Sequence, residues 1–234
     1  EANFPRYDRP KYSYYLQFSD APAYAHSVVT FPSGKNSLTG FIFGEENTKG
    51  LVVVSPGRGE GVERCLPEVL YFVDHGWRVF SFDYTGSFAS EGKNSVGLPQ
   101  SRVDLEAALT YIQNNPSLNR LPVVLWGFSW GGYAVAAVLK DHSNISAVVS
   151  ISGFNSPVEL LDEQIRNQLG ALRFAMQPFG WVYQYVRFGH SAWVTAVDGI
   201  NSSNTPVMIV HGTADTMISY TGASIIAQRE IITN

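Results

Sequence analysis

The sequence predicts an α/β protein with a mostly parallel, doubly wound sheet, and three observations support this fold class. With 234 residues, 45% of them hydrophobic, the chain can bury one sizeable core. Apolar segments typical of buried parallel strands recur at 51–54, 77–82, 121–126, 147–151 and 207–210. Helical segments lie between them, at 62–74, 98–113 and 130–140. This alternation indicates βαβ crossovers that place helices on both faces of the sheet.

A β-hairpin is expected to lead the sheet. The segments 26–31 and 37–43 are rich in β-forming residues, and the turn-forming residues Pro-Ser-Gly-Lys-Asn at 32–36 separate them. The residues before the hairpin mix Pro, Tyr and Arg, which favours an extended N-terminal arm over 1–25. We expect a single domain, 1–234, that includes this arm and the antiparallel hairpin.

Charge and composition exclude several classes of partner. The formal net charge is −4, only 15% of the residues are charged, and Lys and Arg do not cluster, which argues against nucleic acid and anionic membranes as partners. No apolar run approaches the length of a membrane span. The single cysteine, Cys65, excludes an intramolecular disulfide but leaves the compartment open, cytoplasmic or secreted. Because the first residue is Glu1, a removed signal peptide and a trimmed start both remain open.

One long segment interrupts the alternation of strands and helices. About fifty residues separate the strand that ends near Ser152 from the one that begins near Pro206. Within them, 157–168 has the pattern of an amphipathic helix, and 172–188 is crowded with large apolar side chains: Phe174, Met176, Phe179, Trp181, Tyr183, Tyr185 and Phe188. We expect a helical lid insertion over 155–204. Most of these side chains should pack it onto the body, and a minority should line an apolar cleft above the strand ends.

One motif carries the chemistry of a nucleophile. Residues 127–131, Gly-Phe-Ser-Trp-Gly, match G-x-S-x-G directly after a predicted strand and directly before a predicted helix. A sharp turn there holds Ser129 in a strained conformation, and glycines on both sides avoid clashes of Cβ atoms with the strand and the helix. The helix N-terminus also favours developing negative charge. This context favours a catalytic Ser129 over an ordinary strand–helix turn.

Asp215 is the candidate catalytic acid. It closes the segment His-Gly-Thr-Ala-Asp at 211–215, directly after the strand 206–210, and the chain order Ser, Asp, His is the one used with such an elbow. Asp215 would hold an imidazole in the correct tautomer and stabilise it once protonated. The alternative is an aspartate in a surface turn.

An oxyanion hole requires two backbone N–H groups aimed at the developing alkoxide. We expect one from Trp130, the residue after the nucleophile, and the other from Arg58 in the glycine-rich loop 55–61. A plain βα loop without a catalytic role is the alternative for that loop. The Arg58 side chain could also favour a substrate carboxylate.

Together these motifs resemble the α/β-hydrolase superfamily. The residues that carry the resemblance are Ser-Pro-Gly at 55–57, Phe-Asp-Tyr-x-Gly at 82–86, the elbow with its additional Gly132, and 211–215. The chain is most similar to the bacterial esterase and dienelactone-hydrolase-like branch, which also resembles the catalytic domain of prolyl oligopeptidases, and the match runs from about Lys49 to the end. The resemblance implies an α/β-hydrolase fold that cleaves an ester, thioester or amide through an acyl-enzyme, without a cofactor.

The same resemblance places the catalytic histidine after a further helix and strand beyond the acid. A helix is predicted over 221–230, and the sequence then ends at Asn234. We therefore expect the last strand and the histidine to lie beyond residue 234; a fragment without a base and a second chain that supplies it are the alternatives. The sequence has five other candidates: His26, His75, His142, His190 and His211. Of these His211 lies nearest the expected cleft, although an HG pair at that place is typically structural in this superfamily.

The leading hypothesis for function is a carboxylesterase-like serine hydrolase acting on a small ester or acyl substrate. A peptidase of the same superfamily and a non-catalytic binding protein on this scaffold are the alternatives. A haloalkane dehalogenase is excluded, because its elbow carries Asp where this chain has Ser129. No His/Cys cluster has metal-ligand spacing, so no metal is expected. Asp83 and Asp104 fit structural roles, in which they hydrogen-bond a βα loop and open a helix. The oligomeric state is left open.

Overall fold

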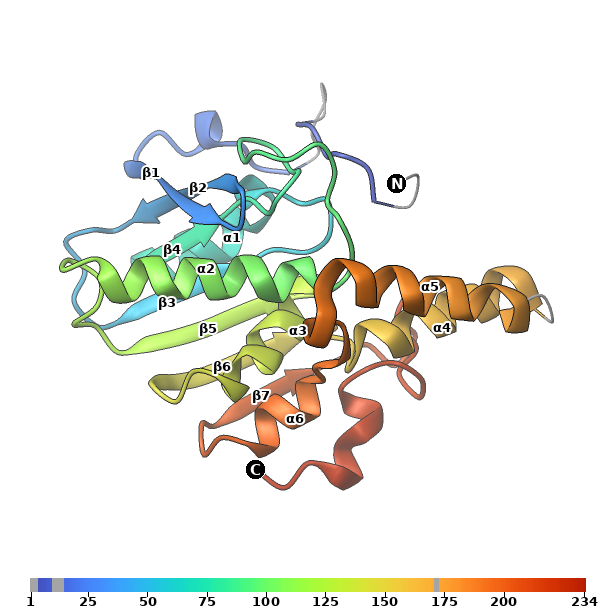
Figure 1. Cartoon of the computed structure of the whole chain (residues 1–234). Helices are drawn as coiled ribbons and strands as arrows, with labels where there is room; N and C mark the ends of the chain where they lie inside the picture. The colour runs from blue at the N-terminus through green and yellow to red at the C-terminus, as the bar shows by residue number, and fades with distance from the viewer. Residues whose placement is uncertain (1–3, 10–14, 171–172) are drawn as a thin grey trace.

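The computed structural model describes residues 4–9, 15–170 and 173–234, and within them seven strands form one sheet in the order β1-β2-β4-β3-β5-β6-β7 (Figure 1). The strands are β1 His26–Ser33, β2 Asn36–Phe43, β3 Leu51–Ser55, β4 Arg78–Phe82, β5 Val123–Phe128, β6 Ile145–Ile151 and β7 Val207–Val210. From β4 to β7 neighbouring strands are parallel. The fold class predicted from the sequence is confirmed.

The N-terminal hairpin also forms as predicted. β1 and β2 pair antiparallel from His26 opposite Phe43 to Ser33 opposite Asn36. Gly34, in the turn between them, has a φ of 58°, which glycine adopts without strain. β2 then pairs antiparallel with β4, so the hairpin extends one edge of the sheet.

Helices cover both faces of the sheet because its central strands are apolar on both sides. Every residue of β3 is buried. Val52 and Val54 pack in one apolar cluster with α1 (Leu66–Asp74), whereas Leu51 and Val53 belong to the cluster on the other face. That other face is covered by α2 (Gln100–Asn114) and α3 (Trp130–Ala137), and α6 (Ala196–Asn201) packs beside α3 (Figure 1). Two of the helices are extended to their predicted lengths by short 3-10 turns: α1 is preceded by Val62–Cys65, and α3 is followed by Val138–Lys140.

The segment between β6 and β7 forms two long helices that project from the body (Figure 1). α4 (Pro157–Leu169) begins with Ser156 as N-cap, whose hydroxyl accepts from the Val158 amide, and with proline at its first position. α5 (Arg173–Phe188) follows, and a 3-10 turn, Gly189–Trp193, returns the chain to the body. We refer to α4 and α5 as the helical hairpin.

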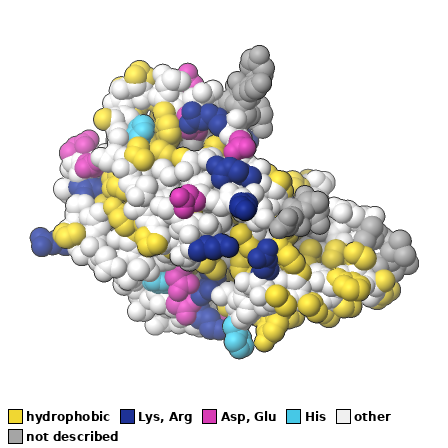
Figure 2. All heavy atoms as spheres, turned by 45° about the horizontal axis from the view of Figure 1, so that its top comes forward, with side chains coloured by type: hydrophobic (Ala, Val, Ile, Leu, Met, Phe, Trp, Pro, Cys, Tyr) yellow, Lys and Arg dark blue, Asp and Glu magenta, His cyan; other side chains and the backbone are white. Residues whose placement is uncertain are grey.

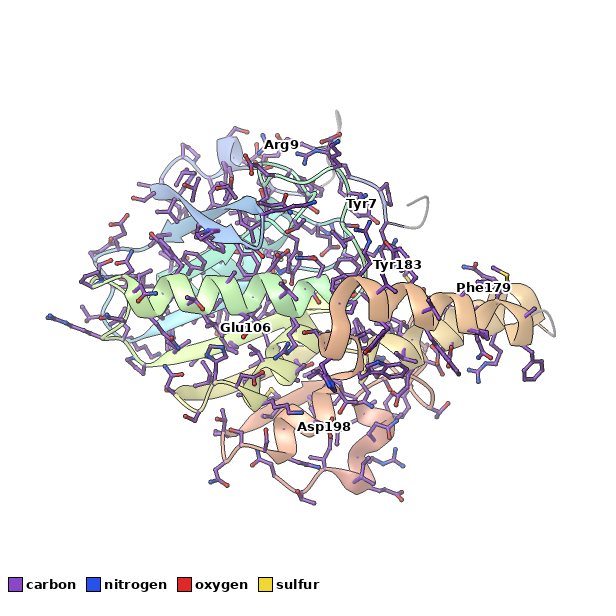
Figure 3. The ribbon with its side chains drawn as sticks, in the orientation of Figure 1. Tyr7, Arg9, Glu106, Phe179, Tyr183 and Asp198 are labelled. Carbon is purple, nitrogen blue, oxygen red and sulfur yellow. The ribbon has the colours of Figure 1, made fainter. Side chains whose placement is uncertain are left out.

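The large apolar side chains of α5 do not pack mainly onto the body, contrary to the expectation from sequence. Five of the seven are exposed: Phe174, Met176, Phe179, Trp181 and Tyr185. Figure 2 shows hydrophobic side chains gathered over this projecting part. Phe179 lies on the projecting stretch and Tyr183 nearer the body (Figure 3), where the Tyr183 hydroxyl donates to the Val96 carbonyl at 2.8 Å. The C-terminal half of the helix is therefore attached to the body through Tyr183.

The helix predicted over 221–230 is wrong. The chain turns at 219–222 and forms only a 3-10 helix at Ile226–Ile231. The residues between are taken by tertiary pairing: Phe154 and Ser224 form an antiparallel bridge, and the Ile225 amide donates to the Gly153 carbonyl at 3.0 Å. Backbone groups that form these tertiary hydrogen bonds are not available to an α-helix, so tertiary pairing overrides the local helix propensity here.

Asp83 hydrogen-bonds a βα loop as predicted, whereas Asp104 does not open a helix: α2 begins at Gln100, and Asp104 lies inside it and also bonds the loop after β4. Asp83 accepts from the amides of Val62 at 3.0 Å and Ala89 at 3.1 Å, and Asp104 accepts from the Thr85 amide at 2.8 Å. Both side chains are almost fully buried, and burial raises the pKa of each above its ordinary value, that of Asp83 to about 6. Buried carboxylates thus fix the loop after β4.

The raised pKa of Asp83 predicts a specific pH dependence of folding stability. The folded-state pKa of about 6 lies above the ordinary 3.8, so the folded state binds this proton more tightly than the unfolded chain does. Its contribution to stability is present at pH 4 and is lost as the pH rises through about 6, a change of roughly 3 kcal/mol. Urea unfolding of the wild type and of Asp83→Asn at pH 4.5 and 7 tests this. The stability difference should shift in favour of the variant at pH 7, and a pH-independent difference would contradict the assignment.

Candidate active site

The elbow places Ser129 at the carboxyl end of β5 in a conformation that few residues adopt. Its φ is 55° and its ψ is −109°, its amide donates to the Ile151 carbonyl at 2.8 Å, and its side chain is half-buried. A positive φ in a residue with a Cβ is costly, by roughly 1–3 kcal/mol, so the surrounding structure must enforce it. The serine predicted as nucleophile therefore stands where a strained strand-to-helix turn was expected.

Close packing around the elbow explains its glycines. A Cβ built on Gly127 would lie 2.3 Å from the Gly131 carbonyl oxygen, and one on Gly131 would lie 1.9 Å from the Ser55 carbonyl oxygen. The Gly131 amide donates to the Pro56 carbonyl at 3.0 Å. The start of α3 is thus held directly against the loop after β3, and this contact brings the two predicted oxyanion segments together.

Backbone strain gathers at this edge of the sheet. Among the described residues, four non-glycine residues have positive φ: Phe88, Val96, Ser129 and Ser152. Ser129 follows β5 and Ser152 follows β6, while Phe88 and Val96 lie in the loop after β4, so all four lie at the carboxyl ends of parallel strands. Strained residues cluster at functional sites, and ligands bind at this edge in open α/β sheets.

The predicted oxyanion amides lie on adjoining segments. Trp130 is the first residue of α3, where a helix leaves its N–H groups without intrahelical partners, and within the described part of the chain its amide has no acceptor. Arg58 lies in the loop after β3, and its guanidinium stacks 4.9 Å from the Phe4 ring centroid and 5.5 Å from that of Trp130. Its Nε donates to the Tyr7 hydroxyl at 2.9 Å. The Arg58 side chain is therefore directed at the N-terminal arm.

The N-terminal arm lies across this edge of the sheet, which the sequence did not predict. The Tyr7 amide donates to the Gly86 carbonyl at 2.9 Å, and the Tyr7 ring covers Gly59 so closely that an added Cβ would lie 2.6 Å away. Arg6 donates to the carbonyls of Ser90 at 3.0 Å and Gly92 at 2.9 Å. Residues 4–9 therefore lie against the loops after β3 and β4, and the Phe4 ring lies 6.3 Å from the ring of Trp130, the residue after Ser129. The parts of the predicted arm at 1–3 and 10–14 lie outside the described residues.

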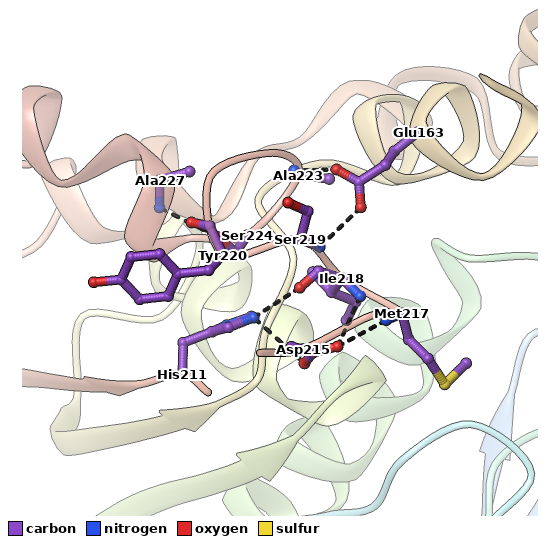
Figure 4. Close-up of polar contacts among 10 residues, drawn as sticks. All are labelled: Glu163, His211, Asp215, Met217, Ile218, Ser219, Tyr220, Ala223, Ser224 and Ala227. Atoms are coloured by element: carbon purple, nitrogen blue, oxygen red, sulfur yellow. Dashed lines mark hydrogen bonds and ion pairs between the residues drawn. The ribbon is translucent and has the colours of Figure 1, made fainter. Parts of the chain in front are cut away.

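Asp215 follows β7, two strands from β5. Its Oδ1 accepts from the amides of Met217 at 2.9 Å and Ile218 at 3.0 Å, and its side chain is 19% exposed (Figure 4). The amide of Ser129, after β5, donates to the Ile151 carbonyl at the end of β6. The amide of Ser152, after β6, donates in turn to the Val210 carbonyl at the end of β7. The two predicted catalytic residues thus lie on the same edge, with β6 between their strands.

The structure gives His211 a different environment from that of a general base. Its side chain is fully buried, and Nε2 lies 2.9 Å from the Ile218 carbonyl oxygen and 3.4 Å from Asp215 Oδ2. Because a carbonyl oxygen only accepts, Nε2 carries the proton and donates to it. Nδ1 is buried with no hydrogen-bond partner among the described residues. A buried imidazole engaged in this way supports the loop and is not exposed to substrate.

The other four histidines lie away from the elbow or on the surface. His26 begins β1, His75 ends α1 and His142 precedes β6, which places all three at the amino ends of the parallel strands, opposite Ser129. His190 is exposed in the turn after α5. The structure therefore brings Ser129, Trp130, Arg58 and Asp215 to one edge of the sheet. It places none of the five histidines, all of which lie in the described ranges, beside the serine.

A cavity of about 850 Å³ lies beside this edge rather than at the serine. It is lined by the β1–β2 turn, the loop 91–96 and the ends of α2 and α5. Within the described ranges, no group of three or more His, Cys, Asp or Glu side chains could hold a metal ion. None of the helices described is both long and apolar enough to cross a membrane.

The sequence around this site matches a known family. The model of the serine aminopeptidase S33 family matches residues 46–175, which is more than half of the chain. The chain belongs to this family. It is thereby a member of the α/β-hydrolase superfamily, and the resemblance drawn from its motifs is confirmed.

Two curated relatives have sequences similar to this S33-family chain. The polyketide transferase GrgF of Penicillium sp. is 26% identical over 119 residues, which cover 50% of this chain and 40% of the transferase. The uncharacterized peptidase YtmA of Bacillus subtilis is 23% identical over 193 residues, 82% of this chain and 69% of the peptidase. The chain thus spans between two fifths and about two thirds of the length of these relatives.

Solved structures with this fold include esterases and peptidases. An esterase of Pyrococcus furiosus superposes with a TM-score of 0.68 at 16% identity, over 97% of this chain and 83% of the esterase. The acylaminoacyl peptidase of Pyrococcus horikoshii superposes with a TM-score of 0.62 at 14% identity, over 89% of this chain and 35% of the peptidase. At these identities the likeness shows the α/β-hydrolase fold of the S33-family chain and not its substrate.

Proposed function

We propose that this S33-family chain is the catalytic part of a serine hydrolase that cleaves carboxylic esters through an acyl-enzyme. The observation that carries the proposal is Ser129, held at φ 55° between β5 and α3 beside the Trp130 amide, which has no acceptor among the residues that the structure describes. An ordinary strand–helix turn has no need of a strained serine next to an amide without an acceptor.

The proposed reaction uses three parts of this site. Ser129 Oγ attacks the ester carbonyl and gives its proton to a histidine, while the amides of Trp130 and Arg58 donate hydrogen bonds to the developing oxyanion. The histidine returns the proton to the departing alcohol as the carbonyl–alkoxy bond breaks, which leaves the acyl group on Ser129. Water then attacks this ester by the same route, releases the acid and restores the serine.

The proposal takes the general base from a histidine beyond residue 234, oriented by Asp215. The partly exposed Asp215 carboxylate can be reached from the sheet edge, whereas the ring of His211 is fully buried and donates to the Ile218 carbonyl. Asp215 would hold the imidazole through a hydrogen bond and stabilise it when protonated.

An aminopeptidase is the second candidate, favoured by the name of the serine aminopeptidase family and by the naming of YtmA as a peptidase. Such an enzyme binds the free α-amino group of its substrate, which needs a carboxylate when the ammonium is desolvated. Glu60, the acidic residue of the loop after β3, is half-buried and lies 3.4 Å from Arg64. The surface next to Ser129 is aromatic, because the Trp130 ring lies there beside the Phe4 ring. These observations favour a substrate whose acyl group carries no ammonium over the substrate of an aminopeptidase.

Two 4-nitrophenyl esters separate the candidates. The full-length protein would be assayed on the 4-methylpentanoyl ester and on the leucyl ester, which differ only by the α-amino group. We expect kcat/KM to be higher for the 4-methylpentanoyl ester by roughly tenfold or more, because a buried, unpaired ammonium is unfavourable. A preference for the leucyl ester would support the aminopeptidase instead. Binding of either ester without turnover would support the non-catalytic alternative.

A further inference from the structure

A buried glutamate from the helical hairpin contacts the loop that carries Asp215. Glu163 lies on α4 and is only 4% exposed. Its Oε1 accepts from the Ser219 amide at 2.9 Å and its Oε2 from the Ala223 amide at 2.8 Å (Figure 4). We call residues 211–223 the acid loop. Hydrogen bonds from neutral donors to a carboxylate are stronger than those between neutral groups, so this is a firm attachment.

Two carboxylates together hold the backbone of the acid loop. Asp215 binds the amides of residues 217 and 218, and Glu163 binds the amides of residues 219 and 223. The amides of residues 217, 218 and 219 are consecutive along the chain. A displacement of the backbone at residue 219 therefore also moves the amide of residue 218, which Asp215 binds. The orientation of the Asp215 carboxylate therefore depends on where Glu163 holds the loop.

The far side of the acid loop is fixed separately. The Asn155 amide donates to the Ala223 carbonyl at 2.7 Å, and Phe154 pairs with Ser224. Glu163 thus joins this anchored end to the backbone next to Asp215, where the His211 ring also donates to the Ile218 carbonyl. Arg166 lies 3.9 Å from the Glu163 carboxylate and is largely exposed, so the two amides are the main partners of Glu163 among the described residues.

We propose that Glu163 is a positioning residue for the catalytic acid: by bonding the amides of Ser219 and Ala223 it holds Asp215 in the orientation that the catalytic histidine requires. The proposal rests on the proposed function. It makes the first helix of the hairpin part of the catalytic support, so that a movement of α4 changes the orientation of the acid. Its consequence is kinetic, because a displaced acid stabilises the imidazolium less well.

The test compares Glu163→Gln with Asp162→Asn in the full-length protein. An amide oxygen can replace only one carboxylate acceptor, and its NH₂ group would face a donor. Asp162, the neighbour on the same helix, accepts from Trp181 Nε1 at 2.9 Å within the hairpin and has no bond to the acid loop. We expect Glu163→Gln to lower kcat for the ester roughly tenfold with KM little changed, since the general base is weakened and binding is not. Asp162→Asn should leave kcat unchanged.

The pH profile separates positioning from mere stability. A less well held Asp215 lowers the pKa of the catalytic histidine, so the acid limb of kcat/KM should move to lower pH by about half a unit or more in Glu163→Gln and stay in place in Asp162→Asn. A lower melting temperature with an unmoved acid limb would overturn the proposal.

A second variant reaches the same contact from the opposite side. A Cβ on Gly222 would lie 1.9 Å from Glu163 Oε2, so Gly222→Ala displaces the carboxylate without removing its charge. The acid limb should shift in the same direction as in Glu163→Gln, and the double variant should add little to either. Additive losses would contradict a shared contact. If a fluorophosphonate does not label the wild-type protein, the proposed function fails, which is distinct from an unmoved acid limb in an enzyme that is labelled.

Discussion

Replacing Ser129 by alanine should remove essentially all ester hydrolysis and leave the fold intact. Loss of the nucleophile in serine hydrolases costs on the order of 10⁴- to 10⁶-fold in kcat, because the oxyanion donors alone supply only the remaining catalysis. Alanine has the same Cβ as serine, so the strain at φ 55° is unchanged, and within the described ranges the hydrogen bonds of Ser129 are made by its backbone. The melting temperature should therefore stay close to that of the wild type.

Ser152 provides the matched control. It is also half-buried, also has a positive φ of 49°, and follows the neighbouring strand at the same edge of the sheet. Ser152→Ala should keep its activity within a few-fold of the wild type. Equal losses in the two variants would mean that strained serines at this edge share a structural role, and the assignment of Ser129 would then fail.

Gly131→Ala should have the largest effect on stability of any single methyl added near the site. The new Cβ would lie 1.9 Å from the Ser55 carbonyl oxygen and 2.8 Å from that of Pro56, both backbone atoms that cannot move alone. Overpacking of this kind costs roughly 3 kcal/mol or more, which corresponds to a drop in melting temperature of about 10 °C for a chain of this length.

The same substitution should impair catalysis beyond its effect on stability. Separating α3 from the loop after β3 breaks the hydrogen bond from the Gly131 amide to Pro56 and moves the amides of Trp130 and Arg58 apart. Gly212→Ala is the control, because nothing lies within 4 Å of a Cβ there and its φ is not positive. Thermal unfolding and ester hydrolysis measured side by side test both effects. A variant at Gly131 as stable as the one at Gly212 would contradict the packing described for the elbow.

The sheet and the elbow were predictable from sequence because their signals are local. The apolar run of β3, the turn between β1 and β2, and the glycines around Ser129 each follow from neighbours along the chain. The chain order of Ser129 and Asp215 then assigns both to the carboxyl edge of the sheet. The parallel topology explains why, since it brings the carboxyl ends of β5 and β7 to the same edge of the sheet.

The features missed from the sequence all depend on partners far along the chain. Glu163 has the position of an ordinary charge on an amphipathic helix, and only the fold brings it to amides 56 and 60 residues later. The 3-10 helix at Ile226–Ile231 is short because tertiary pairing takes the backbone before it. The sequence predicts that most large apolar side chains of α5 pack the insertion onto the body, but a helix that projects from the body leaves five of the seven exposed.

The most direct test of the central claim is labelling of the full-length protein with a fluorophosphonate, followed by intact mass and peptide mapping. A fluorophosphonate reacts only with a serine activated by a base and an oxyanion hole. We predict one adduct per chain, mapped to Ser129 and absent from Ser129→Ala and from heat-denatured protein. A folded full-length protein that remains unlabelled, or an adduct on another serine, would contradict the assignment of Ser129 as the nucleophile.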